Sequence, residues 1–229
     1  QEYCTAKFQL TTCLKEGAPF FVSRHSAPLS PIPALIFETL QEKIETILPL
    51  SYRDRVYPHD LENIMAAYAL TGIAPEDLKR GVATFVRPPH RLEFVKQHRG
   101  VEYVNDSKAT SVDAVIKAVS ALKGPIVLIA GGVDKGGAFR DWIPFFRGKV
   151  SRVLALGAAA QRIEQELAEE VCVERVASLR EGVARASQVA TSGETVLLSP
   201  GCSSYDHFRD YQHRGEVFKQ SVEEIEERI

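Results

Sequence analysis

The chain has 229 residues, 45% of them hydrophobic and 25% charged, with a formal net charge of −2. This balance is typical of a globular protein with a sizeable core, and its interspersed charges argue against a surface built for nucleic acid or an anionic membrane. Four cysteines without Cys-x-x-Cys spacing argue against a disulfide scaffold and against zinc, and without a signal peptide pattern or an apolar run of roughly 20 residues we expect a cytoplasmic protein.

The first 88 residues read as short elements around a proline-rich loop. Prolines at 28, 31 and 33 mark that loop. Apolar residues at 37, 40, 44, 47 and 48 have helical spacing, although their β-branched content also allows a pair of strands. Residues 61–70 predict a helix that ends at Thr71-Gly72, and Pro75 opens another. The stiff pair Pro88-Pro89 then separates a first domain, 1–88, from a second domain, 89–229.

After the proline pair, short apolar strands alternate with helices. We predict strands at 92–97, 101–105, 126–130, 152–156, 171–175 and 195–199. We predict helices at 112–122, 139–146, 159–169, 179–190 and 208–228. Continuous apolar strands alternating with helices indicate a mostly parallel sheet covered on both faces, so we expect a doubly wound, Rossmann-like α/β domain.

The turn at 104–110 concentrates polar chemistry between a strand and a helix. It carries Asp106, Lys108 and Thr110, and Ser111 can cap the helix that follows. These residues fall at the carboxyl end of a strand, where open α/β sheets bind ligands. The helix start and Lys108 suit an anion, whereas Asp106 can accept from ligand hydroxyls. An ordinary capped turn is the competing interpretation, since Asn-Asp-Ser is common turn chemistry.

Two further loops belong to the same edge of the predicted sheet. Residues 131–137 place four glycines around Lys135, which lets the backbone approach an anion closely. Residues 199–206 add hydroxyls and N–H groups before the last helix. Because the carboxyl ends of parallel strands share one edge, the three loops can converge on one cleft, and the two lysines favour a ligand with carboxylates or phosphates. Each loop alone could also be a flexible loop or a plain helix cap.

Gly157 and Glu174 loosely imitate a dinucleotide-binding unit. Gly157 follows one predicted strand, and Glu174 lies near the end of the next. The chain contains no Gly-x-Gly-x-x-Gly motif, so we favour helix–strand packing over nicotinamide binding as the role of this glycine.

Taken together, these segments resemble the D-glutamate-adding branch of the Mur ligase family. The resemblance rests on Pro89-His90-Arg91-Leu92-Glu93, on residues 105–110, on the glycine loop with Lys135, on Leu198-Ser199-Pro200 through Ser204, and on Tyr211 with His213-Arg214-Gly215. It implies a three-domain enzyme, of which this chain carries the tail of the central ATPase domain, 1–88, and the carboxy-terminal domain, 89–229. No Gly-Lys-Thr or Gly-Lys-Ser phosphate-binding loop occurs here, so we expect the chain alone to be inactive.

The resemblance implies an ATP-dependent amide-bond ligase. In that chemistry ATP phosphorylates the alanyl carboxylate of UDP-N-acetylmuramoyl-L-alanine, and the D-glutamate amine attacks the acyl phosphate through a tetrahedral intermediate. By resemblance, Arg91, Asp106 and Lys108 bind the nucleotide, and Lys108 is also catalytic. The residues implied for D-glutamate are Thr110, Lys135, Ser204, Tyr205 and Tyr211, the last standing where the family usually has phenylalanine.

By the same resemblance, residues of the first domain complete the nucleotide site. Asn63 matches an adenine-contacting asparagine, whereas Asp60 departs from the asparagine usual at its position. Lys7 matches a catalytic lysine that is carbamylated and holds Mg²⁺, because a carbamate offers the oxygen ligands that magnesium prefers. An exposed lysine on an ordinary helix at 3–14 is the alternative for Lys7.

The resemblance further implies a monomer that takes small-molecule substrates and binds neither nucleic acid nor membrane. The competing class is a non-catalytic module that binds anions or nucleotides, which such a fold alone would allow. A nicotinamide-dependent dehydrogenase is a third option, resting on Gly157 and Glu174.

Overall fold

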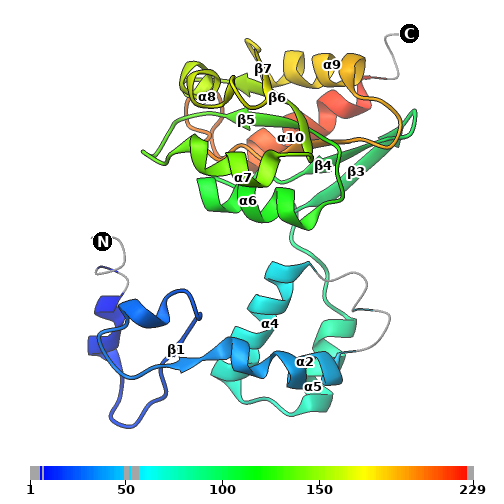
Figure 1. Ribbon diagram of the computed structural model, residues 1–229. Helices are drawn as coiled ribbons and strands as arrows, with labels where there is room; N and C mark the ends of the chain where they lie inside the picture. The colour runs from blue at the N-terminus through cyan, green and yellow to red at the C-terminus, as the bar shows by residue number, and fades with distance from the viewer. Residues whose placement is uncertain (1–5, 7, 49–51, 53–56, 226–229) are drawn as a thin grey trace. The chain divides into compact units, whose positions relative to one another are not determined.

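The computed structural model describes residues 6, 8–48, 52 and 57–225, and the chain divides into two compact units (Figure 1). The first unit is Gln1–Val86 and the second is Arg87–Ile229. The division lies two residues before the end of the first domain predicted from the sequence, 1–88.

The first unit is built mainly from helices around one small apolar cluster. Its elements are η1 (Gln9–Cys13), β1 (Phe21–Val22), η2 (Ala27–Leu29), β2 (Leu35–Ile36), η3 (Phe37–Leu40), α2 (Gln41–Ile47), α4 (Pro58–Thr71) and α5 (Pro75–Ala83). Residues 37–47 are therefore helical, not a strand pair, because Ile44 packs into the cluster with Met65 and Leu78. Gly72 ends α4 with φ 60°, a left-handed conformation that costs glycine little.

The second unit contains one six-stranded sheet, as predicted. Its strands are β3 (Glu93–His98), β4 (Val101–Asn105), β5 (Ile126–Gly131), β6 (Val150–Leu156), β7 (Cys172–Arg175) and β8 (Thr195–Leu198). Its helices are α6 (Val112–Ala121), η4 (Phe139–Trp142), α7 (Ile143–Phe146), α8 (Ala160–Leu167), α9 (Leu179–Val189) and α10 (Tyr211–Glu223). The predicted α/β fold class is confirmed.

The strand order is β3-β4-β8-β5-β6-β7, and only β3 runs antiparallel to its neighbour. From β4 to β7 the sheet grows in one direction, so right-handed crossovers carry α6, α7 and α8 over one face. The return from β7 to β8 reverses that direction and carries α9 over the other face, where α10, which follows β8, also packs (Figure 1). The sheet is therefore doubly wound, and β8 fills the place between β4 and β5.

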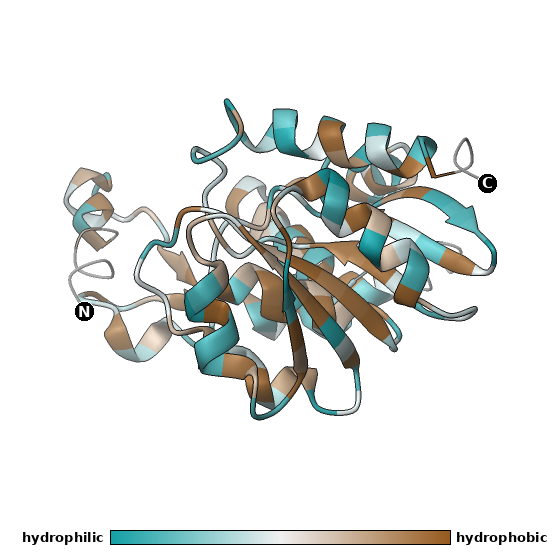
Figure 2. Cartoon of the chain, turned by 90° about the horizontal axis from the view of Figure 1, so that it is seen from above, coloured by the Kyte–Doolittle hydropathy of each residue, from teal (hydrophilic) through white to brown (hydrophobic). Residues whose placement is uncertain are grey.

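The core of the second unit lies on both faces of this sheet. All residues of β5 and β8 are buried, and the central strands of the sheet appear mostly brown in Figure 2 because they are largely apolar. On one face, Val183 of α9 and Phe218 of α10 pack against Ile129 and Leu198. Burial of such side chains stabilises by roughly 1.5–3 kcal/mol each, so this sheet gives the loops at its edge a rigid base.

Some predicted boundaries in the second unit are wrong. The first strand begins at Glu93, because Leu92 takes a left-handed φ of 42° that a strand cannot contain. The last helix begins at Tyr211, not at 208, because the Asp210 carboxylate accepts from the His213 N–H at 2.7 Å and caps it there. The segment 139–146 is helical as predicted, as a 3₁₀ turn followed by one turn of α-helix.

Among the helices that the structure describes, none combines the length and apolar character needed to cross a membrane.

Candidate active site

The turn after β4 is held by local hydrogen bonds. The side-chain oxygen of Asn105 accepts from the Ser107 N–H at 3.1 Å, and the Ala109 N–H donates to the Asp106 carbonyl at 2.9 Å. The helix start is where the sequence predicted it, directly after Ser111, but this serine makes no side-chain capping hydrogen bond. The first N–H groups of an uncapped helix remain available to an anion.

Asp106 is a buried carboxylic acid within this turn. Its Oδ2 accepts from the Ser199 hydroxyl at 3.0 Å, and its Oδ1 accepts from the Leu92 N–H at 3.2 Å. Burial raises the pKa of Asp106 to about 7, even though these hydrogen bonds and the charges of Arg91 and Arg87 lower it. A carboxyl group that titrates near neutrality can both accept from ligand hydroxyls and share a proton with them.

The three predicted loops do converge at the carboxyl edge of the sheet. Because β8 lies between β4 and β5, the loop after β8 contacts both of the others. The Gly201 N–H donates to the Ala109 carbonyl at 2.9 Å, and Val133 and Ser203 exchange two backbone hydrogen bonds of 2.9 Å. The loops are therefore joined by their backbones before any ligand is bound.

Two predicted ligand-binding side chains from different loops lie together. The Lys135 ammonium donates to the Thr110 hydroxyl at 3.4 Å. Ser204, which directly follows the Ser203 that pairs with Val133, is buried, whereas Tyr205 is 74% exposed. The structure thus brings Thr110 and Lys135 together and leaves Tyr205 on the surface.

Tyr211, the first residue of α10, contacts the turn after β4 in two ways. Its carbonyl accepts from the Ser107 hydroxyl at 2.8 Å. Its ring lies under the Lys108 ammonium, with Nζ 3.8 Å from the ring centroid, which is cation–π geometry. Tyr211 therefore lies beside a residue predicted for the nucleotide, although the sequence predicted it for D-glutamate.

Arg214 ties the loops together from inside the protein. It is 1% exposed, and its guanidinium donates to the Ser107 hydroxyl at 3.0 Å, to the Ser107 carbonyl at 2.9 Å and to the Cys202 carbonyl at 3.1 Å. Burial lowers the pKa of Arg214 to about 10, so the side chain stays charged at neutral pH. These three acceptors are neutral, so the positive charge adds to the potential at the loop edge.

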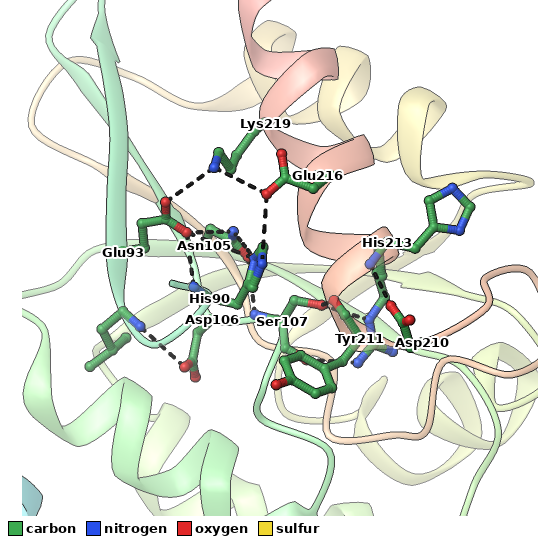
Figure 3. A network of polar contacts seen from close by, with 12 residues as sticks. His90, Glu93, Asn105, Asp106, Ser107, Asp210, Tyr211, His213, Glu216 and Lys219 are labelled. Carbon is green, nitrogen blue, oxygen red and sulfur yellow. Dashed lines mark hydrogen bonds and ion pairs between the residues drawn. The ribbon is translucent and has the colours of Figure 1, made fainter. Parts of the chain in front are cut away.

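A polar network fixes the segment just before β3 against β4 and α10 (Figure 3). His90 is 5% exposed, and its Nδ1 lies 2.9 Å from Nδ2 of Asn105. Because Oδ1 of Asn105 accepts from Ser107, Nδ2 is the donor and His90 Nδ1 must accept. The neutral ring then carries its proton on Nε2, which lies 3.6 Å from a Glu216 carboxylate oxygen.

Glu93 and Lys219 close this network. Glu93 accepts from the His90 N–H at 2.9 Å and from Asn105 at 3.0 Å, and it pairs with Lys219 at 3.3 Å. Although burial raises the pKa of Glu93, the His90 hydrogen bond and Lys219 outweigh it and hold the pKa below its usual value. The neighbouring Arg91 is therefore presented from a fixed backbone.

The first unit holds the remaining predicted residues that the structure describes. Asn63 lines a cavity of about 320 Å³ whose walls are largely apolar and include Ile64 and Leu78. Asp60, at the same cavity, accepts from the Tyr57 N–H at 3.1 Å and so caps the start of α4. Lys7 lies outside the described residues. Among those that are described, no group of three or more His, Cys, Asp or Glu side chains could hold a metal ion.

The surroundings of Gly157 favour packing over dinucleotide binding. A Cβ at this position would collide with an Asp206 carboxylate oxygen and approach Gly132 Cα within 3.1 Å. Glu174 is paired with Arg185 at 2.7 Å and with Arg152. The space and the carboxylate that a dinucleotide would need are therefore already used by the protein.

Sequence reasoning assigned no role to His90, Glu93 or Arg214, although all three lie in the motifs that carry the resemblance. Arg214 was detectable, because positions 214, 218 and 222 form one buried stripe of α10 and a charged residue in such a stripe needs buried partners. The positions of His90 and Glu93 had no such periodic signal, since they depend on contacts with β4 and α10.

The sequence of this chain is similar to a known protein family and to curated proteins. The family model described as "Mur ligase, glutamate ligase domain" matches residues 90–202, which include the turn after β4, the glycine loop and the first residues of the loop after β8. A UDP-N-acetylmuramoylalanine--D-glutamate ligase of Protochlamydia amoebophila is 40% identical over 245 residues, covering 97% of this chain and 54% of that protein. This chain thus spans about half the length of the curated relative.

Solved structures support the fold. UDP-N-acetylmuramate-alanine ligase MurC from Thermotoga maritima superposes with a TM-score of 0.54 at 14% identity, over 73% of this chain and 38% of that one. MurF ligase from Thermotoga maritima, solved in complex with ADP, superposes with a TM-score of 0.50 at 16% identity, over 73% of this chain and 39% of that one. At such identities the likeness concerns the fold alone.

Proposed function

This chain belongs to the Mur ligase family, and we propose that it is the carboxy-terminal part of an ATP-dependent ligase that adds D-glutamate to UDP-N-acetylmuramoyl-L-alanine. The observation that carries the proposal is the convergence of three loops on one edge, with Lys135 on Thr110 and Ser199 on Asp106. Such an edge offers cations, hydroxyls and a titratable carboxyl group within one small area.

On this proposal the nucleotide meets Arg91, Asp106 and Lys108 in the second unit. Asp106 accepts from ribose hydroxyls through a carboxyl group that Ser199 and the Leu92 N–H hold in place. Arg91 and Lys108 offset the negative charge of the phosphates. In the first unit, the apolar walls around Asn63 suit a flat base, and its amide supplies polar recognition.

D-glutamate meets the other half of the edge. Lys135 and Thr110 offer a cation and a hydroxyl to one of its carboxylates. Ser204 and Tyr211 are proposed for the same ligand, Tyr211 from its position beside Ser107 and Lys108. Tyr205, which is 74% exposed, would contact this ligand only from the rim. The amine of D-glutamate then attacks the acyl phosphate of the alanyl substrate, and the lysines stabilise charge on the transferring phosphoryl oxygens.

Magnesium is expected in this chemistry, with Lys7 as a carbamate ligand. Lys7 lies outside the described residues. The described residues bind, orient and neutralise charge around the substrates.

Calorimetric titration of the 229-residue chain with D-glutamate, L-glutamate and ADP tests the proposal. We expect saturable binding of D-glutamate with at least about tenfold preference over L-glutamate, because three fixed loops present donors to one enantiomer. Equal binding of both enantiomers and of inorganic phosphate would instead indicate a general anion-binding module.

A further inference from the structure

Trp142 occupies a junction between all three loops. It is the only tryptophan of the chain and is completely buried. It ends η4, which follows directly on the glycine loop that carries Lys135. Phe139 and Phe146 pack on it, with ring centroids 5.0 and 5.5 Å away. Only four residues, 138–141, separate the indole from the end of the glycine loop, so a movement of the indole is coupled to that loop.

The indole also holds the start of α6. Its Nε1–H donates to the Val112 carbonyl at 3.1 Å. Val112 is two residues after Thr110, and its side chain leaves no room for a Cβ at Gly137, which would lie 2.6 Å from Val112 Cγ2. The start of α6 is thus clamped between Trp142 and the end of the glycine loop.

The other edge of the indole meets the loop after β8. Gly201 has φ 68°, and a Cβ there would lie 2.6 Å from Trp142 Cζ2 and 3.0 Å from Cη2. The ring therefore fills the space that a side chain at 201 would need. The same Gly201 donates its N–H to Ala109, so the indole supports the backbone bond that joins two loops.

We infer that Trp142 is a positioning residue that sets the spacing of Thr110, Lys135 and Ser204, and with it the recognition of D-glutamate. The inference rests on the proposed function for the identity of the ligand. Each of those residues lies on a different loop. Trp142 ends the element that follows the glycine loop, donates to the first residue of the helix that follows the turn after β4, and packs on Gly201 of the loop after β8. The residues proposed for the nucleotide, Asp106 and Arg91, are held instead by Ser199, Leu92 and the His90 network.

Trp142→Phe tests this inference, because phenylalanine keeps an aromatic ring but lacks both the Nε1–H donor and the ring atoms that touch Gly201. Calorimetry should find D-glutamate affinity reduced about tenfold or more, since small displacements of ligand groups are costly, while ADP affinity stays within about twofold. Should Trp142→Phe fail to fold, Gly201→Ala disturbs the same contact from the loop side. Its D-glutamate affinity should likewise fall while its ADP affinity is retained.

Phe146→Leu is the matched control. It removes packing from the same aromatic cluster but keeps the indole donor and its contact with Gly201, so Tm should fall while D-glutamate affinity is retained. Unchanged D-glutamate affinity in Trp142→Phe, or an equal loss in Phe146→Leu, would overturn the inference.

A measurement without ligand separates this inference from the proposed function. Hydrogen exchange at the Gly201 and Ser203 amides, which donate to Ala109 and Val133, should accelerate in Trp142→Phe but not in Phe146→Leu. If wild type bound no D-glutamate yet exchange responded in this way, the proposed function would fail while the positioning role stood. Unchanged exchange at both amides would remove the positioning role.

Discussion

The two units of this chain reach their stability by different routes. In the second unit, neighbouring strands come from distant parts of the sequence, as where Val104 of β4 lies beside Leu197 of β8. In the first unit, the apolar cluster joins residues from helices that are near one another in the sequence, such as Ile44, Met65 and Leu78. The second unit therefore contains buried hydrogen bonds between its loops, whereas the first unit depends on local helix formation.

This difference predicts where a substitution is felt. Removing a buried hydrogen-bonding side chain in the second unit should lower the stability of that whole unit, because hydrogen bonds connect its loops and strands into one network. A change at a helix end in the first unit should remain local and small. Trp142 lies in the second unit and is the only tryptophan, so its fluorescence reports that unit alone, while far-ultraviolet circular dichroism reports both.

The largest effect is expected for Arg214→Met. Three oxygens of Ser107 and Cys202 lose their donor, and the loss exceeds what is regained by no longer burying a charge. We expect the second unit to lose about 3–5 kcal/mol of unfolding free energy, measured by urea denaturation with Trp142 fluorescence. Arg209→Met, at an exposed arginine of the preceding loop, is the control and should change stability by less than about 0.5 kcal/mol. Equal effects of the two substitutions would contradict the role given to Arg214.

The next effect concerns pH and Asp106. The folded pKa of about 7 exceeds the ordinary value of 3.8, so the native state holds this proton more tightly than the unfolded state does. The associated stability is present below pH 3.8 and is lost as pH rises to about 7, a difference on the order of 4 kcal/mol. Asp106→Asn should flatten this part of the stability profile and be more stable than wild type above pH 7.

Asp113→Asn is the control for this pH profile, because Asp113 is an exposed carboxylate in the first turn of α6. It should leave the slope between pH 3.8 and about 7 as in wild type. A wild-type profile without this slope would show that Asp106 does not titrate near neutrality.

An intermediate effect is expected on ligand affinity, where two substitutions at the carboxyl edge of the sheet should each weaken the binding of a different ligand. Lys135→Ala removes a charge-assisted hydrogen bond and should weaken D-glutamate binding by about 1.5–3 kcal/mol while ADP binding changes little. Arg91→Ala should do the reverse. Calorimetry of both variants with both ligands provides the test, and equal shifts for both ligands would show that the edge is not divided in this way.

The smallest effect is expected in the first unit. Asp60→Ala removes the carboxylate that accepts from the Tyr57 N–H at the start of α4, which should cost about 1 kcal/mol. Circular dichroism should detect this as an earlier loss of helix, with the Trp142 transition unchanged. Lys79→Ala, on the exposed side of α5, should alter neither signal. A shift of the Trp142 transition in Asp60→Ala would mean that the two units unfold together.

Much of the second unit could be predicted from sequence because its central strands are largely apolar. The runs at 101–105 and 126–130 predicted β4 and β5 to within one residue, since burial on both faces leaves room for few exposed positions, of which Glu102 is the one in β4. Glycine and proline likewise marked the ends of α4 and the start of α5. The loops at 104–110, 131–137 and 199–206 followed from the rule that parallel strands present their carboxyl ends at one edge.

The tertiary structure alone decided how those loops are joined. Nothing local in the sequence indicates that β8 enters between β4 and β5, because strand order depends on which long-range pairings bury the most surface. That order places Gly201 against Trp142 and Arg214 beneath Ser107 and Cys202. It likewise buries Asp106, whose pKa depends on its surroundings in the fold and not on its neighbours in the chain. Sequence therefore determined which residues reach the edge, whereas long-range packing determined their spacing and charge.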